Sequence, residues 1–191
     1  MPQDNVPTVG IDDLAVYVPG LYLPLEGEFA RRRGIDPGKL IKGIGIERMA
    51  VPDAHEDAAT MAAMSLLLLM RRSRLQPEQI GKIYVGTESS ADEAKAMGTY
   101  VIGMLEQVYG QGSFRECGTV EMKAACIATT FALESQSYWL AGEDEDRVGV
   151  VIASDVAKYP LASPGEYTQG AGSVSLLLKK NPRLVSLEQV Y

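Results

Sequence analysis

Arg147 to Ala153 reads RVGVVIA, a near-continuous hydrophobic stretch that indicates a strand covered on both faces, as in parallel sheets. A second buried strand is expected at Ile80 to Gly86, with the sequence IGKIYVG. Asp92 to Tyr109 has apolar residues spaced by three and four, and Ala125 to Leu140 is strongly apolar, so both segments predict helices. Strands that alternate with helices favour an α/β fold with parallel strands.

Outward from this centre the alternation continues. The last two strands, Gly172 to Leu178 and Arg183 to Gln189, predict an antiparallel hairpin at one end of the sheet. The order of elements is therefore β, α, β, α, β, α, β, β. Further expected segments are a strand at Val9 to Val18, a charged helix at Glu26 to Arg33, a loop at Lys42 to Ile46, a buried helix at Asp57 to Leu75 and a short strand at Thr119 to Met122.

The composition excludes several classes of protein. The 191 residues carry 18 Lys and Arg against 25 Asp and Glu, and a net charge of −7 argues against binding to nucleic acid or anionic lipid. The longest apolar run, Met61 to Met70, is too short to cross a bilayer, and the polar N-terminus is no secretory signal. Two cysteines make no disulfide framework and fit a reducing cytoplasm, where we expect the protein.

The sequence contains no motif typical of a metal site or a nucleotide site. The chain has one histidine and no CxxC or HExxH motif, so no metal site is expected. It also has no GxGxxG or GxxxxGK[ST] motif, which argues against a dinucleotide-dependent oxidoreductase or an NTPase. His55 lies between acidic neighbours and reads as a solvated loop residue, and Cys117 reads as a packing residue.

Cys126 is the strongest candidate for a chemical role. It lies between a predicted strand and the first turn of a predicted helix, where free backbone N–H groups and the helix dipole stabilise a thiolate. The same amides could hold an oxyanion. The alternative is a small buried hydrophobe, because free cysteine is among the most buried residue types.

Glu88 is the second candidate, since it directly follows the strand that ends at Gly86. Sites of α/β proteins lie at the carboxyl ends of parallel strands. A partly buried glutamate there could serve as a general acid or base, and the alternative is an ordinary loop or helix-cap carboxylate. Gly165 to Gly172 is dense in small and polar residues, which fits either close backbone approach to a ligand or a tight turn into a strand.

Together these segments resemble the hydroxymethylglutaryl-CoA synthase family of the thiolase superfamily. The resemblance runs over almost the whole chain and in the family's order, which makes it specific. The motifs that carry it are Val9 to Asp12 with Tyr17-Val18-Pro19, Gly43-Ile44-Gly45 with Met49-Ala50, Gly86 to Ser89, Glu121 to Cys126, Ala153 to Ala157 and Pro164 to Gly172. The resemblance implies an α/β thiolase-like half-fold with a mixed five-stranded sheet and a buried helix opened by the nucleophilic cysteine.

The resemblance also implies an acyltransferase that needs no cofactor. Cys126 would take the acetyl group of acetyl-CoA as a thioester, and Glu88 would remove a methyl proton so that the acetyl carbon attacks acetoacetyl-CoA. Hydrolysis would release 3-hydroxy-3-methylglutaryl-CoA for the mevalonate pathway. By position in the family pattern, Asp36 and Pro37 would line the CoA end of the site, and Tyr159, Ser163 and Thr168 would line the acyl pocket.

The resemblance covers only the first of the two similar halves of the thiolase fold. Residues 1–191 would be a single N-terminal half-domain, and the family's catalytic histidine belongs to the second half, a place that His55 does not fill. We therefore expect a partner chain or domain that supplies this half, in a dimer or higher oligomer. Two alternatives stay open: a β-branching synthase that acts on carrier-protein-bound acyl groups, and a non-catalytic structural subunit.

Overall fold

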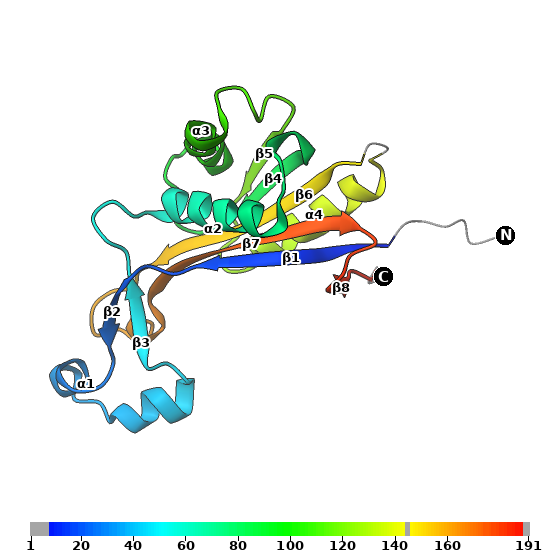
Figure 1. Ribbon diagram of the computed structural model, residues 1–191. Helices are drawn as coiled ribbons and strands as arrows, with labels where there is room; N and C mark the ends of the chain where they lie inside the picture. The colour runs from blue at the N-terminus through cyan, green and yellow to red at the C-terminus, as the bar shows by residue number, and fades with distance from the viewer. Residues whose placement is uncertain (1–7, 144–145, 189–191) are drawn as a thin grey trace.

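A computed structural model describes residues 8–143 and 146–188, and its centre is a mixed sheet of six strands in the order β5-β4-β6-β7-β1-β8 (Figure 1). Strands β4 (Ile80–Gly86), β5 (Gly118–Met122) and β6 (Val148–Ala157) run parallel, with β4 in the middle. The α/β class and the parallel centre are confirmed. The sheet has six strands rather than the expected five, although each of the six overlaps a segment that the sequence predicts as a strand.

The other half of the sheet is antiparallel. Strand β7 (Gly170–Lys180) pairs with β6 on one side and with β1 (Val9–Tyr17) on the other, and β1 pairs in turn with β8 (Val185–Ser186). The expected terminal hairpin is therefore wrong, since β1 lies between β7 and β8. Arg183 explains the detour, because its backbone and side chain both donate hydrogen bonds to the Asp12 carboxylate of β1. The described part of the last strand is two residues long, and Gln189 lies outside the described residues.

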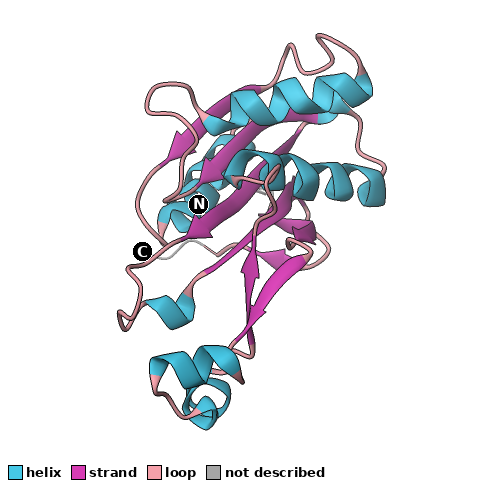
Figure 2. Ribbon diagram, turned by 90° about the vertical axis from the view of Figure 1, so that its left-hand side faces the viewer, coloured by secondary structure: helices cyan, strands magenta, loops and turns pink. Residues whose placement is uncertain are grey.

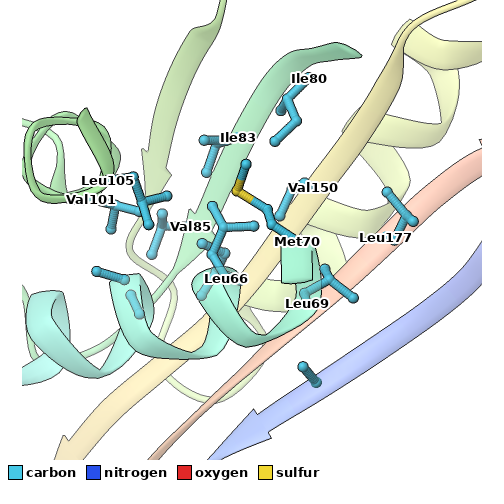
Figure 3. Close-up of a cluster of buried hydrophobic side chains, with 14 of the residues drawn as sticks. Leu66, Leu69, Met70, Ile80, Ile83, Val85, Val101, Leu105, Val150 and Leu177 are labelled. Atoms are coloured by element: carbon cyan, nitrogen blue, oxygen red, sulfur yellow. The ribbon is translucent and has the colours of Figure 1, made fainter. Parts of the chain in front are cut away.

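Helices cover both faces of the sheet. Helices α2 (Ala58–Ser73) and α3 (Met97–Tyr109) lie on one face and α4 (Ala128–Ala141) on the other. Helix α2 begins at a capping box in which Asp57 accepts from the Thr60 amide and Thr60 accepts from the Asp57 amide. Its buried face meets β4, β6 and β7 in the main core (Figure 3), which includes Leu66, Leu69, Met70, Ile83, Val85, Val150 and Leu177.

Three glycines let α4 lie close to the sheet. A Cβ added to Gly149 would come within 2.1 Å of the Gln136 side chain, and one on Gly81 within 2.5 Å of Trp139. A Cβ on Gly86 would meet the Thr129 backbone at 2.5 Å. Because α4 approaches this closely, its N-terminus is held directly over the end of β4.

Strand β6 is buried by this chain alone. Val150 and Ile152 belong to the core on the α2 side, and Val151 belongs to the core on the α4 side. The coverage of this strand on both faces, expected from its sequence, is therefore provided by residues of this chain. Helix α4 is less completely covered, because its outward stripe of Ile127, Phe131 and Tyr138 is about half exposed.

A small lobe stands apart from the sheet on a two-stranded ribbon (Figure 2). Strands β2 (Leu21–Pro24) and β3 (Arg48–Val51) form the ribbon, and α1 (Glu28–Arg33) and a π-helix (Lys39–Ile44) form the lobe. The π-helix replaces the loop expected at Lys42 to Ile46. The lobe has its own core of Leu25, Phe29, Leu40 and Met49. Within residues 8–143 and 146–188, no helix is long and apolar enough to span a membrane.

Candidate active site

The carboxyl ends of the three parallel strands meet at one edge of the sheet. Gly86 at the end of β4 is in register with Met122 at the end of β5 and with Ala153 of β6. Glu88 follows β4 by two residues and Cys126 follows β5 by four. The two side chains meet there, with the Cys126 sulfur 3.9 Å from Glu88 Oε2. The structure thus brings together the two residues that the sequence singled out for chemistry.

Cys126 sits in a tight turn between β5 and α4. Ala125 has a φ of 48°, a left-handed conformation that an alanine adopts only where the surrounding structure imposes it. The turn redirects the chain after β5. It leaves the Cys126 side chain exposed, two residues before α4 begins at Ala128. The cysteine therefore precedes the first turn of a helix, as expected, and it is not a buried packing residue.

Asp155, for which the sequence alone indicated no separate role, holds the loop that carries Glu88. Its Oδ1 atom accepts from the Glu88 amide at 2.7 Å, from the Ser89 amide at 3.1 Å and from the Ser89 hydroxyl at 2.9 Å. The Thr87 hydroxyl lies 2.8 Å from the same atom. One carboxylate oxygen thus gathers the polar groups of three successive residues, which fixes the backbone under Glu88. The available signal was a carboxylate near the end of a parallel strand, the same signal that identified Glu88.

Three of the five expected substrate contacts lie in the segment between β6 and β7. The Tyr159 amide donates to the Gln169 side chain at 2.8 Å, and the Thr168 hydroxyl donates to the Gly165 carbonyl at 2.9 Å. The Ser163 hydroxyl oxygen is buried and makes no hydrogen bond to the described residues. These contacts fold the segment into a compact loop beside the end of β6.

The other two expected contacts lie in the lobe. Asp36 and Pro37 connect α1 to the π-helix, where Asp36 accepts from the Gly38 amide at 2.9 Å. The lobe lies beyond the end of the sheet at which β6 finishes, so it faces the same end of the molecule as Glu88 and Cys126 (Figure 1). The five residues therefore lie in two adjoining segments beyond this end of the sheet. Among the described residues, the structure records no direct contact between them and the Cys126–Glu88 pair.

The remaining titratable candidates behave as packing or solvent-facing groups. Burial raises the pKa of the Cys117 thiol to about 12, so this cysteine is protonated at neutral pH and inert as a nucleophile. His55 is exposed in the loop before α2 and lies 3.9 Å from Asp53, as the sequence indicated. Glu88 is exposed rather than partly buried, whereas Thr87 directly before it is fully buried.

Comparison with known proteins gives this geometry a family. Residues 2–182 match the family described as hydroxymethylglutaryl-coenzyme A synthase N terminal. The chain belongs to the hydroxymethylglutaryl-CoA synthase family. It is 44% identical over 187 residues to the hydroxymethylglutaryl-CoA synthase of Haloferax volcanii, an alignment that covers 96% of this chain and 42% of the relative. The enzyme of the same name from Enterococcus faecalis is 36% identical over 182 residues, with 95% and 45% covered.

Solved structures agree with the sequence relatives. The structure of MvaS in complex with 3-hydroxy-3-methylglutaryl coenzyme A superposes with a TM-score of 0.87 and 37% identity, covering 95% of this chain and 42% of that one. The thiolase-like half-fold of the synthase family is therefore confirmed for this chain. The chain spans less than half the length of these relatives.

Proposed function

We propose that this chain is the nucleophile-bearing half of a hydroxymethylglutaryl-CoA synthase, which condenses acetyl-CoA with acetoacetyl-CoA. The observation that carries the proposal is the 3.9 Å contact between Cys126 and Glu88 in a member of this family. A thiol and a carboxylate at this distance can serve a single acyl group, the first as nucleophile and the second as base. A non-catalytic subunit has no need to keep this pair in contact.

The first half-reaction makes an acyl-enzyme. The Cys126 thiolate attacks the carbonyl carbon of acetyl-CoA, a carbon–sulfur bond forms, and the CoA thiolate leaves and takes up a proton. Backbone N–H groups at the start of α4 would stabilise the oxyanion of the tetrahedral intermediate. The product is an acetyl thioester on Cys126, whose methyl protons are acidified by the thioester carbonyl.

The second half-reaction forms the carbon–carbon bond. Glu88 removes one methyl proton, and the resulting carbon nucleophile attacks the ketone carbon of acetoacetyl-CoA, whose oxygen becomes an alkoxide and is protonated. Water then cleaves the Cys126 thioester, which returns the thiol and releases 3-hydroxy-3-methylglutaryl-CoA. This chain supplies the nucleophile and the base for these steps, and the proposal includes no cofactor. Binding of this product by the MvaS relative supports free CoA thioesters over carrier-protein substrates.

A second thiolase-like half would complete the site and cover the exposed α4 face. Register places Leu14 of β1 opposite Leu176 and Val16 opposite Val174, and Leu176 packs in the core on the α4 side. Leu14 and Val16 therefore point to that same face, where they are 37% and 50% exposed. Together with the α4 stripe they form an apolar face that no described residue covers, and a second half packed there would carry the catalytic histidine to Glu88 and Cys126.

Acetylation followed by condensation tests the proposal. The chain with its second half is incubated with acetyl-CoA, and digestion with mass spectrometry should place the acetyl group on Cys126. Cys126→Ser should abolish the modification, whereas Cys117→Ser, the matched control, should retain it. Glu88→Ala should keep acetylation but lose condensation by roughly 10²–10⁴-fold, as expected for a missing general base. Acetyl on Cys117 alone, or condensation by Glu88→Ala near the wild-type rate, would refute the assignment.

A further inference from the structure

The lobe and the loop between β6 and β7 are joined by one buried ion pair. Arg33 of α1 donates from Nε to Glu166 Oε2 at 2.8 Å and from Nη2 to Oε1 at 2.6 Å. The Glu166 side chain is only 3% exposed and that of Arg33 25%. Since both carboxylate oxygens are engaged by one planar guanidinium, the pair fixes orientation as well as distance.

Aromatic packing reinforces the same junction. Tyr167, the neighbour of Glu166, packs into the core of the lobe and meets the Phe29 ring edge-on at 6.1 Å between centroids. The Arg33 guanidinium lies over that Phe29 ring at 5.5 Å. The loop is therefore anchored to the lobe by one charged contact and one apolar contact that share the same phenylalanine.

Glu166 also shapes the loop from within. Its Oε2 atom accepts from the Ala162 amide at 2.7 Å, and Ala162 has a φ of 60°, a left-handed conformation that costs free energy in a residue with a Cβ. The next residue is Ser163, whose carbonyl accepts from the Glu166 amide at 3.1 Å. The carboxylate thus holds the strained residue beside a proposed acyl-pocket residue, and the Arg33 guanidinium holds the carboxylate. In keeping with this contact, the pKa of Glu166 is lowered, mainly by its hydrogen bonds with Arg33.

We propose that Arg33 and Glu166 form a positioning pair that sets the substrate-contacting loop of residues 158–169 against the lobe, so that a CoA thioester is bound in reach of Cys126. The proposal rests on the proposed function and deepens it. Neither residue acts on the reacting atoms. The pair acts through the two segments that it joins, one with Asp36 and Pro37 and the other with Ser163 and Thr168.

This role predicts a specific kinetic signature. If the loop occupies its position only a tenth of the time, the apparent dissociation constant for substrate rises about tenfold, because binding must first select the competent state. Once substrate is bound, Cys126 and Glu88 are unchanged. Glu166→Gln and Arg33→Ala should therefore raise the KM for acetyl-CoA about tenfold or more and leave the maximal acetylation rate within about threefold of wild type. Arg33→Lys should recover part of the loss, since lysine keeps the charge but makes no two-point contact.

The experiment measures acetylation of Cys126 against acetyl-CoA concentration in the chain with its second half. The matched controls are Arg31→Lys and Arg32→Lys, because these neighbours on α1 pair with exposed Glu28 and should leave KM unchanged. Hydrogen exchange in the absence of substrate provides the second readout. Glu166→Gln should speed exchange in residues 158–169 and 34–46 but not in β4 or β6.

The outcomes separate this inference from the function on which it rests. A raised KM with a near-normal maximal rate, and faster exchange confined to the two joined segments, supports the positioning role. If the wild-type protein is acetylated but the variants have the same KM for acetyl-CoA as the wild type, the positioning role alone is refuted. Variants that lose maximal rate and melt at lower temperature at unchanged KM also refute it, because the pair is then merely structural. A wild-type protein that is never acetylated refutes the proposed function and this role together.

Discussion

Replacing Asp155 by asparagine tests whether the loop under Glu88 is held by charge. The Oδ1 atom of Asp155 accepts three hydrogen bonds from Glu88 and Ser89, and an asparagine oxygen in the same place could still accept them. What changes is the charge. A hydrogen bond to an ionised group contributes about 1.5–3 kcal/mol and a neutral one about 0.5–1.5 kcal/mol, so three bonds lose roughly 3 kcal/mol together.

That loss sets an upper limit on the kinetic effect. If all of it fell on the step in which Glu88 removes a proton, the rate would decrease about 10²-fold, since each ~1.4 kcal/mol is a factor of ten. Asp155 is only half-buried, so solvent screens part of its charge and the expected decrease is about 10- to 100-fold. Acetylation of Cys126 needs no proton transfer from the methyl group and should fall by less than about threefold.

The assay compares acetylation with condensation on the same preparation. Acetylation is followed by mass spectrometry and condensation by the release of CoA in the presence of acetoacetyl-CoA. Asp146→Asn is the matched control, because it makes the same substitution at an exposed residue beside the opposite end of β6 and should change neither rate. Condensation within twofold of wild type in Asp155→Asn, or an equal loss in both steps, would show that Asp155 does not act through the Glu88 loop.

Three further predictions follow from burial and charge. Iodoacetamide near neutral pH should alkylate exposed Cys126 and leave Cys117 unmodified until the protein unfolds, because burial raises the pKa of Cys117 to about 12; modification of Cys117 in the folded protein, seen by peptide mapping, would contradict this. Leu66→Ala should lower the free energy of unfolding by about 2–5 kcal/mol, measured by denaturant titration, because Leu66 is fully buried. Leu68→Ala, on the exposed side of the same helix, should lower it by less than about 1 kcal/mol. Equal losses would disprove the assignment of Leu66 to the core. Hydrogen bonds from the Lys95 and Ala94 amides and the Tyr100 hydroxyl lower the pKa of Asp92 to about 2. The contribution of ionised Asp92 to the free energy of unfolding should therefore be complete above the pKa of the unfolded chain, near 3.9, and lost as the pH falls towards 2. A carboxyl NMR titration midpoint near 3.9 in the folded protein would refute this.

The centre of the fold was predictable because burial on both faces leaves a plain hydrophobic pattern. The IGKIYVG and RVGVVIA segments are strands within a few residues of their expected bounds, and their parallel pairing places Glu88 at the same edge as Cys126. Position at a carboxyl end is a local property of the sequence, so both residues could be found. Helix α3, expected from Asp92, begins at Met97. The Glu121 side chain of β5 accepts a hydrogen bond from the Met97 amide, and this contact determines where the helix starts.

The rest depended on contacts that no local pattern reveals. Every residue of β2 is exposed, so the ribbon shows no alternation of buried and solvent-facing side chains. Arg33 and Glu166 are 133 positions apart, and each in isolation reads as a surface charge. The prediction of a terminal hairpin was wrong for a related reason. Adjacent strands in the sequence usually pair, but here a strand from the other end of the chain lies between them.

The position of β1 between β7 and β8 has a consequence for how the chain folds during synthesis. Among the described strands β1 leaves the ribosome first, and its nearer neighbour in the chain, β7, begins only at Gly170. At ~5–20 residues per second, translation of the roughly 150 residues between them takes roughly 8–30 s, during which β4, β5 and β6 can already assemble with their helices. The first of the described strands to be made is therefore among the last of them to be paired, and a nascent chain that stops before Gly170 leaves β1 with neither neighbour. For that interval the apolar side chains of β1 have no neighbouring strand to pack beside, so this side of the sheet can be completed only after β7 has been made.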